Sequence, residues 1–226
     1  MKLLALETSS MRASVALAAG AELREIQIET PREQTAQILP AIERLLAEAG
    51  WSLEALDAIV FGRGPGSFTG LRVAAAVAQG LALATERPLV GVSSLEALAQ
   101  RAYQEHGVQR ALTCVDARMH EVYWAAFQID AVGATRLGPE QVGAPERVAA
   151  PEVSPWSALG DGFRAHAEAL QQVSAGAEQV LADLIPRARD LLPRARLEAR
   201  AGRFLAAAAA LPSYLRDGTA WKPHSA

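Results

Sequence analysis

The chain has 226 residues, 50% of them hydrophobic and 21% charged, which is the composition of an ordinary folded protein and excludes a disordered one. Its formal net charge of −3 at pH 7 gives no overall attraction to nucleic acid or to an anionic membrane. A single cysteine, Cys114, excludes an internal disulfide framework, and because the start MKLLALETSS lacks the apolar run of a signal peptide, we expect a cytoplasmic protein that does not span a membrane.

The first half of the chain is predicted to be a mixed α/β unit. Residues 2–20, KLLALETSSMRASVALAAG, form an apolar strand, an acidic residue, a polar turn and a second apolar strand, which is the pattern of a β-hairpin. Further strands are expected at residues 22–28, 57–62 and 88–92. Helices are expected at residues 31–49, 68–85 and 94–106.

Capping residues mark the starts of two of these helices. Thr30 is expected to cap the first one while Glu33 reaches back to it, and Pro40 should kink that helix. Ser93 and Glu96 form the same signal at the start of the third helix. The first helix also carries a face of apolar side chains, at Ile38, Leu39, Ile42, Leu45 and Leu46.

The second half begins with the same pattern as the first. Residues 110–128, RALTCVDARMHEVYWAAFQ, repeat the order of strand, acidic residue, turn and strand, and Asp116 takes the place that Glu7 has in the first hairpin. A strand hairpin with an acidic residue at its corner, repeated at the start of each half, resembles the duplicated actin-like fold. Sugar kinases and Hsp70-type ATPases share this fold, which belongs to the RNase H-like class. In that fold the two corners face each other across a cleft between two lobes. We therefore expect a duplicated α/β fold with lobes at residues 1–107 and 108–226.

The remainder of the second half is less regular. GDGF, at residues 160–163, is predicted to turn from a strand into a helix. The run to Ala210 is rich in alanine, leucine and arginine, so we expect it to be mostly helical, with interruptions at Pro186 and Pro193. Cys114 lies within an apolar strand, where a buried structural thiol is expected.

A glycine-rich loop, FGRGPGSFTG, lies between a predicted strand and a predicted helix. Backbone N–H groups in such a turn form a good anion site at the helix N-terminus. However, the loop lacks the Gly-Lys-Ser/Thr ending of a Walker loop and the G-x-G-x-x-G spacing of a dinucleotide site. We therefore favour a structural role for Gly64, Gly66 and Gly70, which allow the turn. Ser67 or Thr69 is expected to cap the helix.

The helix after this loop carries small residues on most of its sides. Two rows at a spacing of four residues contain only glycine and alanine: Gly70, Ala74, Ala78 and Ala82, and Ala76 with Gly80. Small side chains allow a close approach to a neighbouring backbone. Packing on the helix's own sheet explains one such face, and the second face predicts a contact with the other lobe or with a partner chain.

Four motifs stand out along the chain. They are GRGPGSFTGLRVAAAVAQGLA, GVSSLEALA at 91–99, VDARMHEVYWAAF at 115–127 and PSYLRDGTAWK at 212–222. Together, and in this order, they resemble the bacterial TsaB family, formerly called YeaZ, whereas residues 130–211 contribute little to the match. The resemblance implies a non-catalytic scaffolding and activating subunit in the synthesis of threonylcarbamoyladenosine on tRNA, next to the anticodon.

The resemblance implies partners and no chemistry of the chain's own. The partners are a TsaD-like catalytic subunit and a TsaE-like ATPase, with tRNA contacted only through the complex and a homodimer when the protein is alone. TsaD holds a metal ion partly through an H-x-x-x-H pair, and Ser94 and Leu98 stand at the aligned positions of this chain. Leucine cannot bind a metal ion, so neither a metal nor another cofactor is expected.

Two sets of residues are the functional candidates. The resemblance implies pairing through the first two helices, and the partner interface is predicted at Leu39, Ile42, Leu46, Leu71, Ala74, Ala75, Ala78 and Ala82. A vestigial cleft is predicted at Glu7, Asp116, Gly64, Gly66 and Ser67. One alternative stays open, in which the protein is an actin-like ATPase or a small-molecule kinase that uses Glu7 and Asp116. In the structural interpretation, Asp116 forms an ion pair with Arg118.

Overall fold

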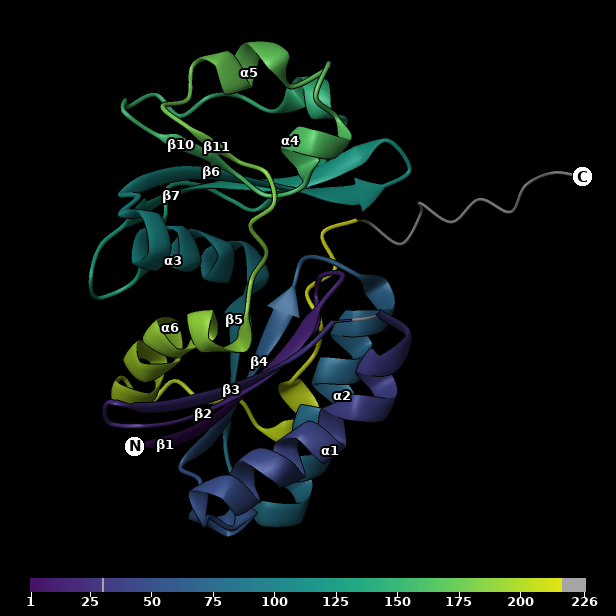
Figure 1. Cartoon of the computed structure of the whole chain (residues 1–226), viewed down its shortest axis with the longest axis vertical. Coiled ribbons are helices and arrows are strands. Elements are labelled where there is room, and N and C mark those ends of the chain that lie inside the picture. Colours follow the sequence, from purple (N-terminus) through teal and green to yellow (C-terminus); the bar gives the residue numbers. More distant parts are fainter. Residues whose placement is uncertain (30, 217–226) are drawn as a thin grey trace, which may run out of the picture.

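The structure is a computed structural model that describes residues 1–29 and 31–216, with the backbone alone for residues 31–34. Its strands form two separate sheets, each in its own lobe (Figure 1). Two helices, α3 (Ser94–His106) and α6 (Ala188–Arg200), lie between the lobes and contact each other. The molecule therefore has the two-lobe arrangement that the sequence repeat predicts.

The sheet of the first lobe is mixed. Its strands are β1 (Lys2–Glu7), β2 (Ala13–Ala19), β3 (Glu22–Ile28), β4 (Ala58–Gly64) and β5 (Leu89–Ser93), in the order β3-β2-β1-β4-β5. β1 pairs antiparallel with β2 and parallel with β4. Side chains alternate across a strand, so β1 directs Leu4 and Leu6 to one buried face and Leu3 and Ala5 to the other. Burial of both faces explains why this strand is apolar along its length.

Helices cover both faces of the first sheet. α1 (Pro31–Ala49) and α2 (Phe68–Thr85) pack on one face, where Ile42 and Ala78 belong to the buried core. α6 packs on the opposite face, and its Leu191 is fully buried there. The first sheet is thus the middle layer of three.

The sheet of the second lobe repeats this topology. Its strands are β6 (Arg110–Arg118), β7 (Glu121–Ile129), β8 (Ala134–Arg136), β9 (Gln141–Gly143), β10 (Ser157–Leu159) and β11 (Val180–Leu181). Read from β8, the order is β8-β7-β6-β10-β11, which corresponds strand for strand to β3-β2-β1-β4-β5. The first three strands are antiparallel and the last two are parallel to β6, as in the first lobe. The predicted duplicated actin-like α/β fold is therefore confirmed.

One helix of each half packs on the sheet of the other half. α3 contacts β6, β7 and β8, where its Leu95 and Leu98 share a core with Phe127. α6 comes from the end of the second half and packs on the first sheet. Because the halves exchange helices in this way, the division at residues 107 and 108 stays a prediction.

Most of the predicted elements are present. α1, α2 and α3 have the expected bounds, and the Ser93 side chain accepts a hydrogen bond from the backbone N–H of Glu96 at 3.3 Å. Pro40 lies inside α1. The proposed cap by Thr30 and Glu33 lies outside the described residues. The described residues also form two short helices, α4 (Gly162–Ala165) and α5 (Gln171–Ala175), and three 3-10 turns, at Leu53–Ala55, Pro145–Arg147 and Ala207–Ala209.

The prediction of a mostly helical run up to Ala210 is wrong. α6 is its one long helix, and Pro193 lies inside that helix instead of interrupting it. The chain after α6 is irregular up to the 3-10 turn at Ala207–Ala209, and its Leu205 exchanges two backbone hydrogen bonds with Leu89 at the edge of β5. A free sheet edge therefore overrides the helical propensity of this alanine-rich segment.

Candidate functional site

The glycine-rich loop is an ordered turn between β4 and α2, as predicted. β4 ends at Gly64 and α2 begins at Phe68. Ser67 accepts a hydrogen bond from the backbone N–H of Gly70 at 3.3 Å. Of the two capping candidates, Ser67 and not Thr69 therefore caps the helix.

This turn packs directly on the turn between β1 and β2. A Cβ atom on Gly70 would lie 1.9 Å from the carbonyl oxygen of Thr8, and one on Gly66 would lie 2.5 Å from that of Ser9. The backbone N–H of Ser67 donates to the Ser9 carbonyl at 2.7 Å, and Thr8 Oγ1 donates to the Gly70 carbonyl at 2.6 Å. The chain itself occupies the space and the donors that a phosphate would use. This geometry supports the structural interpretation of the glycines.

Glu7, the acidic corner of the first hairpin, is enclosed. Its side chain has no exposed surface. One carboxylate oxygen accepts the backbone N–H of Ser9 at 2.6 Å, and the other accepts Ser94 Oγ at 2.9 Å. A Cβ atom on Gly62 would lie 2.2 Å from Glu7 Oε2, and burial raises the pKa of Glu7. The expectation that Glu7 opens onto a cleft is therefore corrected, because the neighbouring backbone closes over it.

Asp116, the acidic corner of the second hairpin, is held by its neighbours near the surface. Its side chain is 16% exposed, and Arg118 forms the predicted ion pair with it at 3.2 Å. His166 Nε2 lies 3.3 Å from the other carboxylate oxygen. The backbone N–H of Asp116 donates to Asp161 at 3.0 Å. The two corners thus have different environments, one sealed and one paired at the surface.

The positions expected to hold histidines in TsaD do not form a metal site here. The hydroxyl group of Ser94 donates a hydrogen bond to Glu7, and Leu98 is fully buried among apolar side chains. In residues 1–29 and 31–216, three or more histidine, cysteine, aspartate or glutamate side chains do not come together where they could hold a metal ion. The side chains present therefore do not fit such a centre.

The predicted partner interface is mostly buried within the chain itself. Seven of its eight residues have buried side chains: Ile42, Leu46, Leu71, Ala74, Ala75, Ala78 and Ala82. Leu39 alone among the eight is exposed, at 49%. The choice of residues is corrected for these seven, because small side chains bring α2 close to its own sheet.

A different face of the same two helices remains exposed. On α2 its members are Phe68, Arg72, Ala76, Gly80 and Leu83. On α1 they are Ala36, Leu39, Pro40, Glu43 and Ala47. We call these ten residues the outer helical face. The row of Ala76 and Gly80 was the sequence signal for it, whereas the longer row of small residues indicated the core.

α2 is also long and apolar enough to cross a membrane by length and composition, with a mean hydropathy of 1.3. The apolar residues of α2 lie on two different sides of the helix. One side of the helix belongs to the buried core of the first lobe, and the other is the apolar part of the outer helical face.

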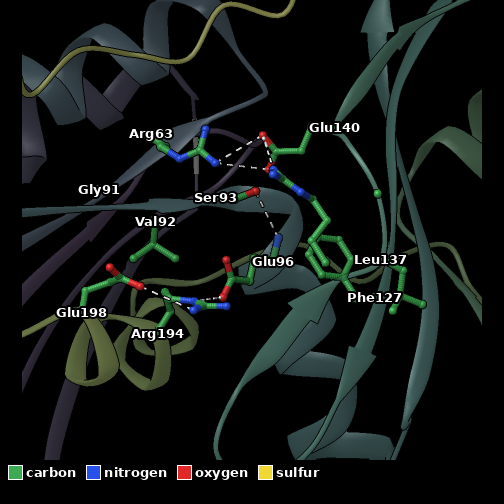
Figure 2. Close-up of a pocket in the computed structure, with 12 residues that line it drawn as sticks. Arg63, Gly91, Val92, Ser93, Glu96, Phe127, Leu137, Glu140, Arg194 and Glu198 are labelled. Atoms are coloured by element: carbon green, nitrogen blue, oxygen red, sulfur yellow. Dashed lines mark hydrogen bonds and ion pairs between the residues drawn. The ribbon is translucent and has the colours of Figure 1, made fainter. Parts of the chain in front are cut away.

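A cavity of about 550 Å³ lies between the lobes (Figure 2). The first sheet contributes β4 and β5, and the second sheet contributes β7 and the end of β8 with the loop after it. The helices α3 and α6 between the lobes supply the rest of the lining. Its charged lining consists of Arg63, Glu96, Arg136, Glu140, Arg194 and Glu198. These residues are far apart in the sequence, so no local motif indicated that they meet. Neither Glu7 nor Asp116 lines this cavity.

The charged residues of the cavity form two groups at opposite ends. At one end Glu140 lies 3.3 Å from Arg63 and 3.5 Å from Arg136. At the other end Arg194 pairs with Glu96 and Glu198 (Figure 2). Burial raises the pKa of Glu96, which the nearby Arg194 partly offsets.

Comparisons with known proteins agree with this fold. The family model "TsaD: tRNA N6-adenosine threonylcarbamoyltransferase" matches residues 28–223. The tRNA threonylcarbamoyladenosine biosynthesis protein TsaB of Escherichia coli K12 is 38% identical over 98% of this chain and 97% of that protein. The corresponding protein of Haemophilus influenzae is 35% identical over 98% and 96% of the two chains. A solved structure, YeaZ from Pseudomonas aeruginosa, is 43% identical and superposes with a TM-score of 0.89, covering 95% of this chain and 99% of that one.

Proposed function

The chain belongs to the TsaB family and has a role in tRNA threonylcarbamoyladenosine biosynthesis, and from this premise we propose that it is the non-catalytic scaffolding and activating subunit of the modifying complex. In this proposal it binds a TsaD-like catalytic subunit and a TsaE-like ATPase in the cytoplasm. It contacts tRNA only through the complex, and it forms a homodimer when alone. The outer helical face is the observation that carries this proposal.

The sealed corner at Glu7 supports a non-catalytic role. A phosphoryl-transferring enzyme of the actin-like fold needs an accessible carboxylate and a loop that can receive phosphates. Here Glu7 has no exposed surface, and the turn at Gly66 and Gly70 is filled by the backbone of residues 8 and 9. The purified chain is therefore expected not to hydrolyse ATP. Magnesium-dependent turnover that Glu7→Ala abolishes would favour the alternative of an ATPase or kinase.

The outer helical face has the composition of a protein-binding surface. Leu83 is 73% exposed and Phe68 is 57% exposed, and Arg72 stacks on the Phe68 ring at 3.6 Å. Between them Ala76 and Gly80 leave room for a partner helix to approach closely. Exposed apolar and aromatic side chains with an arginine are typical of interface centres.

Gly80→Arg tests this surface without disturbing the core. Gly80 is exposed, and a Cβ atom there meets nothing within 4 Å, so the variant should fold and gain helix propensity. The long charged side chain should reduce affinity for a TsaD-like protein of the same cell by about a hundredfold or more. Binding is measured by co-purification and titration calorimetry.

Gln104→Arg is the matched control. Gln104 is an exposed position on α3, away from the outer helical face, so this variant should bind like the wild type. A wild-type chain that fails to bind the TsaD-like protein would contradict the proposed function. Equal binding by the wild type and Gly80→Arg would contradict only the proposed surface.

A further inference from the structure

The cavity between the lobes has a lining whose charge is balanced overall and separated in space. Three arginines and three glutamates line it. Arg63 and Arg136 share the single carboxylate of Glu140, so this end carries a surplus of positive charge. At the other end Arg194 pairs with Glu96 and Glu198, and the exposed Arg203 contacts both oxygens of Glu198 from outside the cavity, so Glu96 is the carboxylate at this end that is left for a ligand.

The arginines at the positive end have guanidinium N–H groups that no described residue accepts. Their distances to Glu140, 3.3 and 3.5 Å, exceed the roughly 2.7–2.9 Å of a tight charge-assisted hydrogen bond. Each guanidinium uses one nitrogen on Glu140 and forms no other hydrogen bond or ion pair to a described residue. A guanidinium presents five N–H donors in a planar fork, which matches the two oxygens of a carboxylate.

Glu96 provides the corresponding acceptor at the other end. Its Oε1 receives Arg194, whereas its Oε2 has no partner among the described residues. Val92, Phe127 and Leu137 add apolar atoms to the lining (Figure 2), and Gly91, Ser93 and Gly138 complete it. The cavity therefore combines a donor end, an acceptor end and an apolar wall.

We propose that this interlobe cavity binds a small zwitterion, an α-amino acid, with its carboxylate on Arg63 and Arg136 and its ammonium group on Glu96. The volume of about 550 Å³ lies in the usual range of small-molecule sites. Phe127 and Leu137 then face the side chain of the ligand.

The charges of the lining disfavour other ligand classes. A nucleotide or another polyanion would meet three carboxylates, and Glu140, with a side chain only 4% exposed, cannot turn out to solvent. A simple cation would meet three guanidinium groups. A ligand with one charge of each sign satisfies both ends, so net neutrality is the main selective feature.

Ligand-detected NMR and titration calorimetry on the full chain test this proposal. Each of the twenty proteinogenic L-amino acids is the probe, followed by the N-acetylated and the decarboxylated forms of those that bind. At least one amino acid should bind, and both modified forms should bind about tenfold or more weakly, since each has lost one charged contact. Failure of all twenty to bind, or equal binding of either modified form, would overturn the zwitterion site.

Arg136→Gln locates the site. Its side chain is 44% exposed and its one ion pair with a described residue is with Glu140, so the variant should fold, and it should lose about tenfold in affinity for the amino acid. Arg44→Gln is the matched control, because Arg44 is an exposed arginine paired with Glu48 on α1. Equal affinities of Arg136→Gln, Arg44→Gln and the wild type would overturn the assignment to this cavity. The assay contains no partner protein, so its failure leaves the proposed function untouched.

Discussion

The two lobes share one strand order, but they differ in what covers their sheets. On the first sheet, α1 and α2 contribute helices of 19 and 18 residues. In the second lobe the corresponding connection from β8 to β10 holds β9 and a 3-10 turn, and the connection from β10 to β11 holds α4 and α5, of 4 and 5 residues. The long helices leave an outward face that the second lobe lacks. A duplicated topology therefore does not duplicate the surface available to a partner.

The acidic corners of the two hairpins also differ, in this case in their burial and their neighbours. Glu7 is sealed by Gly62 and Ser94 and its pKa is raised, whereas Asp116 stays near solvent beside Arg118 and His166. Equivalent positions of a repeat can thus place carboxylates in different surroundings, because the packing and not the topology decides the solvation of a charge.

Two alanines on α2 separate the core from the outer helical face, and this comparison should give the largest effect. Ala78 has no exposed surface, so Ala78→Arg places an unpaired charge and extra bulk in the core of the first lobe. We expect a loss of at least about 4 kcal/mol of stability, enough to unfold the chain. Ala76→Arg, two residues away and exposed, should remain folded and lose only partner binding.

Circular dichroism melting and partner titration distinguish these outcomes. A well-folded Ala78→Arg variant that no longer binds would instead place Ala78 at the interface. A similar fall in melting temperature for both variants would remove the distinction between the two faces of α2.

The ionisation of Asp190, on the helix α6 between the lobes, should make the free energy of unfolding depend on pH. Asp190 on α6 has a fully buried side chain, and burial, which outweighs Arg187 beside it, raises its pKa to about 7. The folded state thus binds a proton that the unfolded state releases near pH 4. The contribution of Asp190 to the free energy of unfolding should therefore be most favourable below about pH 4. It should fall by at most about 4 kcal/mol as the pH rises to 7.

Urea unfolding at a series of pH values measures this slope. Asp190→Asn keeps an acceptor for the Arg187 backbone N–H, which donates to Asp190 at 3.0 Å, and removes the titration. The variant should accordingly flatten the curve between pH 4 and 7. Identical slopes for the variant and the wild type would show that Asp190 ionises normally.

Truncating the two acidic corners should have the smallest effects, and unequal ones. Glu7→Ala leaves Ser94 and the backbone N–H of Ser9 buried without their acceptor, for which we expect a loss of about 2–3 kcal/mol. Asp116→Ala removes partly exposed pairs and should cost less than about 1 kcal/mol. Glu7→Gln, which keeps one acceptor, is the control and should recover much of the loss. Equal losses at both corners, measured by urea unfolding, would contradict the difference between them.

Local patterns in the sequence predicted the elements of the first lobe closely. The alternation of apolar runs located β1 and β2, and the cap at Ser93 located the start of α3, because these signals depend on neighbours within a few residues. Two of the four motifs that resemble the TsaB family, GRGPGSFTGLRVAAAVAQGLA and GVSSLEALA, lie within this lobe. Cys114 as a buried thiol and the ion pair of Arg118 with Asp116 were likewise local inferences, and both are present.

The faces of the helices were decided by the tertiary structure. α2 is apolar on nearly all sides, so its composition could not tell which row of small residues packs on the sheet. Ala74, Ala78 and Ala82 are buried in the core beside the sheet, whereas Ala76 and Gly80 are exposed. The segment after α6 likewise forms no α-helix and pairs with Leu89 through Leu205, although its alanine content favours a helix.

The sequence by itself determined where most strands and helices of the first lobe begin, that two halves repeat one hairpin, and which family the motifs resemble. Each of these depends on short-range spacing along the chain. Only the tertiary structure decided that Glu7 is sealed, which face of α2 is outward, and that Arg63 and Glu140 meet at one end of a cavity. Those outcomes depend on contacts between residues far apart in the chain, 77 positions in the case of Arg63 and Glu140, and on the burial that such contacts impose. Solvation, and with it the charge state and accessibility of a side chain, is a property of the packed molecule.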